Sequence, residues 1–182
     1  MLCFSLQISL QPLFASVKVD TLTKSEKTYI IAKNFVGIKE QGNNSGYWVK
    51  RFLQSCNLKP PAQWCAAFVN FCLDSAGIKT LPMTRSGLAR HFATRNKTIK
   101  ATEVLQKNLS LPSGTIIVWR RGTTLFGHAG LVENWKGKSG TTIEGNTSSG
   151  QSGSQYNGDG VWRRSRTINP TNHFRITDFI VY

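Results

Sequence analysis

Acidic residues and methionine are scarce in this chain of 182 residues, and it has no long hydrophobic run. Its apolar stretches fall well short of the ~18 residues that a membrane span needs, so a transmembrane protein is excluded. Two Met are too few for a Met-rich binding surface, and four Cys are too few for a disulfide scaffold. Hydrophobic residues still make up 40% of the chain, which is enough for a folded core and excludes disorder. One ordinary domain fits this length.

The shortage of acidic residues leaves the chain strongly basic, with 23 Lys+Arg against 9 Asp+Glu and a formal charge of +14. A surface of this kind attracts polyanions such as nucleic acid, anionic membrane surfaces or acidic wall polymers. The basic residues are scattered, however, without a block of five or six like charges or a known nucleic-acid-binding motif. We therefore expect no specific nucleic-acid partner, and a merely solubilising charge remains the alternative.

The N-terminus lacks the features of an export signal. Leu2–Ala15 is mildly apolar but is interrupted by two Gln and one Pro, and no Lys or Arg precedes Lys18. A secretory signal begins with a basic region, which is missing here. We expect residues 1–22 to form an N-terminal extension, either packed or loosely ordered, with a cleaved signal as the less favoured alternative. Residues 23–182 are expected to form a single domain.

Helical patterns occupy the first half of the chain. Thr23–Glu26 is a capping box, which predicts a helix start. From Cys65 to Ala76 the apolar residues recur at i, i+3, i+4, i+7, i+8 and i+11 before Gly77, which predicts the clearest helix. Two further helices are expected near Tyr47–Leu53 and Ser86–Ala93.

Short β-branched runs follow Pro112 and predict about five strands. They are Thr115–Trp119, His128–Glu133, Thr141–Glu144, Val161–Thr167 and Phe174–Val181, separated by turn residues. Helices first and adjacent strands afterwards indicate an α+β fold, with N-terminal helices packed on a C-terminal antiparallel sheet.

Cys65 is the first candidate for chemistry, because it stands at the start of the predicted helix. Unsatisfied N–H groups and the helix dipole at that end favour a thiolate over a thiol. The backbone N–H of Cys65 is also suited to bind an oxyanion. The alternative is a small core residue at the top of an apolar stripe, which is the usual state of a free cysteine.

A thiol nucleophile needs a base, and three histidines are available. His128 lies on a predicted strand among Gly127, Ala129 and Gly130, whose small side chains leave room for a substrate. His91 is expected at the surface and His173 in a turn. His128 is therefore the candidate base, although a strand His is more often structural.

A third group is needed to orient the imidazole. Glu144 and Asn146 are two residues apart at the end of a predicted strand, so an extended chain presents both on one face. We expect a carboxylate here to accept a bond from Nδ1–H of His128. The alternatives are that Glu144 is an exposed charge at the end of a strand and that Asn146 is a residue that forms a turn.

Metal and cofactor sites are not indicated. The His and Cys residues lack ligand spacings such as CxxC or HExxH, the acidic residues form no calcium loop, and no phosphate-binding glycine motif occurs. We expect neither a metal nor a cofactor.

Four segments together resemble the CHAP domain, the cysteine- and histidine-dependent amidohydrolase/peptidase family. They are Trp64–Gly77, Leu111–Trp119, Gly127–Val132 and Ile143–Asn146, and the resemblance extends over about residues 23–181. It implies a papain-like fold of the CHAP/NlpC type and hydrolysis of peptide or amide bonds in bacterial peptidoglycan.

The resemblance also implies residue roles. Cys65 matches the nucleophile, His128 the general base and acid, and Glu144 the orienting group, while Asn146 matches a position that assists or replaces the acidic member. Gln63 and Trp64 are weaker candidates for oxyanion or substrate binding. The implied setting is the cell wall, as a phage lysin, a remodelling enzyme or an effector, and we expect a monomer whose charge holds it on anionic wall polymers. The alternatives are a non-catalytic wall-binding or structural module with the same shell and a basic nucleic-acid-binding protein.

Overall fold

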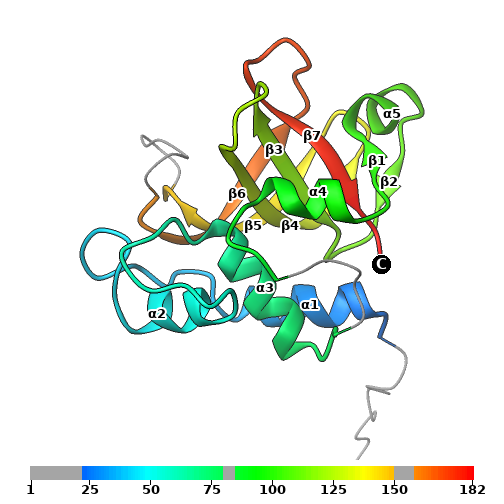
Figure 1. The fold of residues 1–182 in the computed structure, drawn as a ribbon. Helices are drawn as coiled ribbons and strands as arrows, with labels where there is room; N and C mark the ends of the chain where they lie inside the picture. Colours follow the sequence, from blue (N-terminus) through cyan, green and yellow to red (C-terminus); the bar gives the residue numbers. More distant parts are fainter. Residues whose placement is uncertain (1–21, 80–84, 150–157) are drawn as a thin grey trace, which may run out of the picture.

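The computed structural model describes residues 22–79, 85–149 and 158–182, and Figure 1 shows helices packed against a twisted sheet. Residues 1–21, which hold nearly all of the expected N-terminal extension, lie outside the described residues. So do residues 80–84 and 150–157.

The described helices are α1 (Lys24–Lys33), α2 (Tyr47–Gln54), α3 (Cys65–Ser75), α4 (Arg90–Arg95) and α5 (Ala101–Gln106). The capping box is confirmed, because the Glu26 N–H donates to Thr23 Oγ1 at 3.2 Å and the Thr23 N–H donates to Glu26 Oε2 at 2.8 Å. None of the described helices is both long enough and apolar enough to cross a membrane.

The helix expected over Ser86–Ala93 was placed too early, because α4 begins only at Arg90. Leu88, which lies within the range expected for that helix, precedes α4 and is 41% exposed. Helix α5 was not expected from the sequence.

The described sheet has seven strands, not the five expected. They are β1 (Ile99–Lys100), β2 (Ser110–Leu111), β3 (Ile116–Arg121), β4 (Gly127–Lys136), β5 (Ser139–Thr147), β6 (Gly160–Thr167) and β7 (Phe174–Ile180). The order is β1-β7-β3-β4-β5-β6 with β2 paired to β4, and every pairing is antiparallel. The two additional strands have two residues each. The fold is therefore α+β with an antiparallel sheet.

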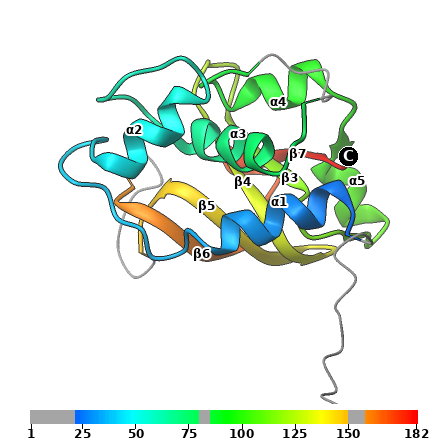
Figure 2. The ribbon, with the colours of Figure 1, turned by 90° about the horizontal axis from the view of Figure 1, so that it is seen from below.

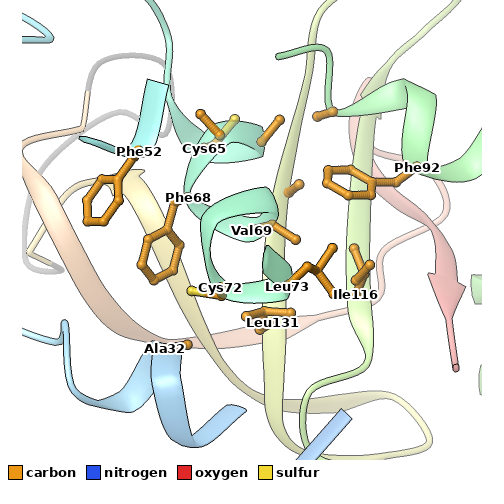
Figure 3. Packing of buried hydrophobic residues seen from close by; sticks show 14 of the residues in the cluster. Ala32, Phe52, Cys65, Phe68, Val69, Cys72, Leu73, Phe92, Ile116 and Leu131 are labelled. Atoms are coloured by element: carbon orange, nitrogen blue, oxygen red, sulfur yellow. The ribbon is translucent and has the colours of Figure 1, made fainter. Parts of the chain in front are cut away.

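Helix α3 is the central helix of the fold (Figure 2). It contacts α1 and α2 and also β4 and β5 of the sheet, whereas α4 packs directly on β3 and β7. Its apolar residues join a core cluster with Phe52, Ile116 and Leu131, as Figure 3 shows. A second cluster, including Ile117 and Phe179, covers the opposite face of β3 and β7. With Phe68, Val69, Cys72 and Leu73 all buried, α3 is a fixed platform for the residue at its N-terminus.

Candidate active site

Cys65 is the first residue of α3, as the sequence pattern predicts. The helix begins with the bond from the Phe68 N–H to the Trp64 carbonyl at 2.8 Å. The Cys65 sulfur accepts hydrogen bonds from the backbone N–H groups of Ala66 and Ala129. It also forms a hydrogen bond with the imidazole of His128. Only 6% of Cys65 is exposed, so the thiol is sheltered but not sealed.

The buried side chain of Trp64 fixes the start of α3. It is completely buried, stacks on Phe52 with ring centroids 5.5 Å apart, and donates its indole N–H to Glu40 Oε2 at 3.2 Å. A side chain held in this way does not reach a substrate. The expectation that Trp64 contacts substrate is therefore replaced by an anchoring role.

His128 is the second residue of β4 and is 2% exposed. Its Nε2 lies 2.9 Å from Glu144 Oε2, and its ring stands edge-on to Trp119 at 5.3 Å between centroids. The expectation that Nδ1 binds the carboxylate was wrong. Because Nε2 is engaged by Glu144, the bond between the imidazole and Cys65 uses Nδ1.

Glycine makes room for this pairing. A Cβ at Gly130 would lie 2.6 Å from Glu144 Cγ, which is closer than packed atoms approach. Only glycine therefore lets the Glu144 side chain lie across β4 and reach His128.

Glu144 is fully buried and accepts hydrogen bonds from three side chains. Besides His128, Thr142 Oγ1 donates to Oε1 at 2.5 Å, and Arg166 donates Nε–H to Oε1 at 2.7 Å and Nη2–H to Oε2 at 2.5 Å. The Arg166 guanidinium also lies 5.6 Å from the centre of the Trp119 ring. Arg166 and Thr142 were not predicted as site residues, and the only sequence signal for Arg166 is its place on the strand that follows Glu144.

The charges of this group shift the acidities in the direction that nucleophilic chemistry requires. Burial alone would raise the pKa of Glu144, but the hydrogen bonds from Arg166 and then His128 outweigh it and hold that pKa well below its usual range. Burial alone would lower the pKa of His128, but the Cys65 thiolate and then Glu144 raise it to about 9. Burial alone would also raise the pKa of Cys65, yet the charge and hydrogen bond of His128 lower it. A thiolate–imidazolium pair is therefore favoured at neutral pH.

The other described cysteines behave in the opposite way. Burial raises the pKa of Cys56 and raises that of Cys72 well above its ordinary value. Cys56 is more exposed than Cys65, and none of the three forms a disulfide. Acidity, and not exposure, distinguishes Cys65 from the other two.

Asn146 has a different partner from the one expected. Its Nδ2 donates to Gln63 Oε1 at 2.6 Å, and its backbone φ of 53° lies in the left-handed region at an irregularity between β5 and β6. The expectation that Glu144 and Asn146 share one face of a regular extended strand was wrong, because the pairing of β5 with β6 is irregular between Glu144 and Thr147 and Asn146 has a left-handed φ. Asn146 instead fixes the side chain of Gln63, an exposed residue two positions before Cys65.

The remaining histidines are not part of this group. His91 Nδ1 lies 2.8 Å from Ser86 Oγ, and His173 is exposed just before β7. Among the described residues, no cluster of His, Cys, Asp or Glu is arranged to hold a metal ion.

A cavity of about 670 Å³ opens in front of the sulfur. Cys65, His128 and Gln63 line one part of it, and the rest comes from the segment before α4, the turn between β3 and β4, and the start of β7. The cavity is large enough to hold several residues of a peptide. The arrangement thus combines a thiol of lowered pKa, an imidazole, a carboxylate bound to that imidazole and a cavity, which are the groups that acyl transfer by a cysteine requires.

Comparison with models of known protein families matches residues 57–146 to the CHAP domain. This span contains Cys65, His128, Glu144 and Asn146 and ends at the last of them. Comparisons with curated proteins and with solved structures give no match. CHAP domains form a family of peptidoglycan amidases and peptidases, and the observed α+β fold agrees with it. The papain-like classification stays a prediction.

Proposed function

Because this chain belongs to the CHAP domain family over residues 57–146, we propose that it is a peptidoglycan hydrolase that uses Cys65 as its nucleophile. The bond cleaved is a peptide bond or the N-acetylmuramoyl-L-alanine amide bond of the cell wall. The contact of Cys65 with His128, and of His128 with Glu144, at the mouth of an open cavity is the observation that carries this proposal.

The first step is attack of the Cys65 thiolate on the carbonyl carbon of the scissile bond. The imidazolium of His128 stabilises the thiolate until the substrate arrives. The C–N bond then breaks, and His128 gives its Nδ1 proton to the leaving amine. An acyl thioester on Cys65 and a free amine are the products of this half-reaction.

Hydrolysis of the thioester completes the cycle. Neutral His128 takes a proton from a water molecule, whose oxygen attacks the thioester carbon. Cys65 leaves as thiolate, the acid product departs, and His128 holds the proton again. Glu144 keeps the same tautomer and orientation of the ring throughout, because Nε2 never leaves the carboxylate.

The tetrahedral oxyanion needs two donors. The backbone N–H of Cys65 is one, because the first N–H groups of a helix have no partner within the helix. We propose the side-chain amide of Gln63 as the other. Gln63 lines the cavity together with Cys65, and Asn146 Nδ2 donates to its Oε1 at 2.6 Å, which fixes the amide at that place.

Purified peptidoglycan tests the proposal directly. The wild-type protein should release soluble fragments, and Cys65→Ala should release none while keeping its fold. Cys56→Ala is the matched control, since it removes a thiol outside the cavity and should retain activity. Equal activity of Cys65→Ala and wild type would remove Cys65 from the chemistry. Mass analysis of the new chain ends separates amidase from endopeptidase.

The +14 charge has a role in this setting. We propose that it holds the protein on anionic wall polymers by non-specific attraction, so that the enzyme acts at the wall.

A further inference from the structure

The cavity beside Cys65 has an apolar wall that solvent reaches. Leu125 and Phe126, in the turn between β3 and β4, are 61% and 57% exposed, and Leu88, before α4, is 41% exposed. All three line the cavity, together with Phe174. Large apolar side chains gathered at one solvent-exposed place indicate a surface that a ligand covers.

The same cavity has a basic end. Arg121 at the end of β3 and His173 just before β7 line it, and both are exposed. The Gly122 N–H donates to the His173 carbonyl at 3.2 Å, and a Cβ on Gly122 would lie 2.9 Å from His173 Cε1. Glycine at position 122, with φ +54°, therefore lets His173 pack against the backbone that directly follows Arg121. None of the described residues that line the cavity is acidic.

We propose, on the basis of the hydrolase function above, that this cavity selects peptides with an apolar side chain close to the scissile bond and a free carboxylate further along. The apolar group packs on Leu125 and Phe126, and the carboxylate binds Arg121 and His173. The cavity thus determines specificity, while Cys65 performs the chemistry.

The sheet register gives the spacing between the two features. Trp119 is paired with His128, and two residues further along β3 the Arg121 N–H donates to the Phe126 carbonyl at 3.1 Å. Two strand residues span about 6.6 Å, and an extended substrate has a similar rise. The carboxylate therefore lies within about three residues of the scissile carbonyl, since the arginine side chain adds reach.

Binding to Cys65→Ala protein tests the proposal without hydrolysis. The probes are three N-acetylated tripeptides measured by calorimetry: Leu-Ala-Ala with a free carboxylate, the same peptide as carboxamide, and Ser-Ala-Ala with a free carboxylate. The carboxylate should bind about fivefold more tightly than the carboxamide, as suits an ion pair at an exposed arginine. Arg121→Gln should abolish this preference. Arg51→Gln removes the same charge from an exposed position on α2 and should preserve it.

The apolar wall is tested in parallel. Phe126→Ser should reduce the preference for the Leu peptide over the Ser peptide, whereas Tyr47→Ser, at a residue 65% exposed outside the cavity, should not.

The outcomes separate this proposal from the proposed function. Equal binding of carboxylate and carboxamide, no binding of any probe, or an equal effect of Arg51→Gln and Arg121→Gln would overturn the specificity proposal even if wild-type protein degrades peptidoglycan. The expected binding pattern would support it even if wild-type protein degraded no peptidoglycan, a result that would remove the hydrolase function alone.

Discussion

Replacing Glu144 by Gln should damage stability and activity at once, and the two effects can be separated. Glu144 has no exposed surface, and the side chain of its partner Arg166 is 13% exposed. Gln keeps the shape of the side chain but removes the charge, which leaves Arg166 buried without its counter-ion. Breaking a buried ion pair from one side costs about 3–5 kcal/mol, and little solvent is present to reduce that cost.

The expected loss in chain stability is large enough to measure. For a protein of this size it lowers the melting temperature by roughly 10 °C. Hydrolysis should fall by about 10²-fold or more, because His128 loses the group that orients it and supports its positive charge. Chemical unfolding and the rate of peptidoglycan hydrolysis are the two assays.

A second substitution distinguishes the two effects. Arg166→Met alone should be similarly destabilising, since it leaves Glu144 buried without its main partner. The double variant removes both charges. Its loss in the free energy of unfolding should be smaller than the sum of the two single losses by about 2 kcal/mol or more. Its activity should stay low, because Glu144 is still missing.

Glu133→Gln is the matched control. Glu133 pairs with Arg163 at 2.9 Å, but the two side chains are 19% and 43% exposed. An ion pair that solvent reaches in this way contributes at most about 1 kcal/mol. If Glu144→Gln were no more harmful than Glu133→Gln, the reasoning on the buried pair would be refuted.

Three further outcomes are expected. The rate of hydrolysis should fall on the alkaline side near the raised pKa of His128, about 9, because the proton for the leaving amine is lost there. It should also fall on the acid side, as the Cys65 thiolate is protonated. A rate that still rises above the pKa of His128 would contradict this. Asn146→Gly tolerates the positive φ and should lower kcat about tenfold with little change in KM, as should Gln63→Ala; strictly additive losses in the double variant would show that the two residues do not act together. Hydrolysis should decrease as salt rises, because exposed charges are screened beyond ~8–10 Å; a flat profile would mean that the charge only keeps the protein in solution.

The helices and strands that could be predicted from the sequence are those in which apolar residues recur regularly over several residues. The apolar repeat from Cys65 and the stop at Gly77 predicted α3 almost to the residue, since the residues of that repeat within the helix are buried while Asp74 and Ser75 near the end of the helix are exposed. The five longer strands were found within a few residues of their bounds. β1 and β2 were missed, because two residues do not establish an alternation and both strands exist only through their partners β7 and β4.

The site was predictable in its residues but not in its bonds. Helix position singled out Cys65, and small neighbours singled out His128. The ring nitrogen that meets Glu144, and the pairing of Asn146 with Gln63, depend on the register of β4 against β5 and on the irregularity at Asn146.

The role of Arg166 depends likewise on tertiary structure. In the sequence it is one of several scattered basic residues, and only the pairing of β6 with β5 brings it to a buried carboxylate.

The central claim is that Cys65 is an activated thiol although it is nearly buried, and site-resolved alkylation near neutral pH tests it most directly. In a Cys3→Ser background three cysteines compete, and because burial raises the pKa of Cys56 and of Cys72, both are almost wholly protonated at pH 6. Mass analysis of iodoacetamide-treated protein should then show Cys65 modified well before the more exposed Cys56, with that advantage lost in His128→Ala. Modification of Cys56 first, or a Cys65 that stays unreactive until alkaline pH, would contradict the account.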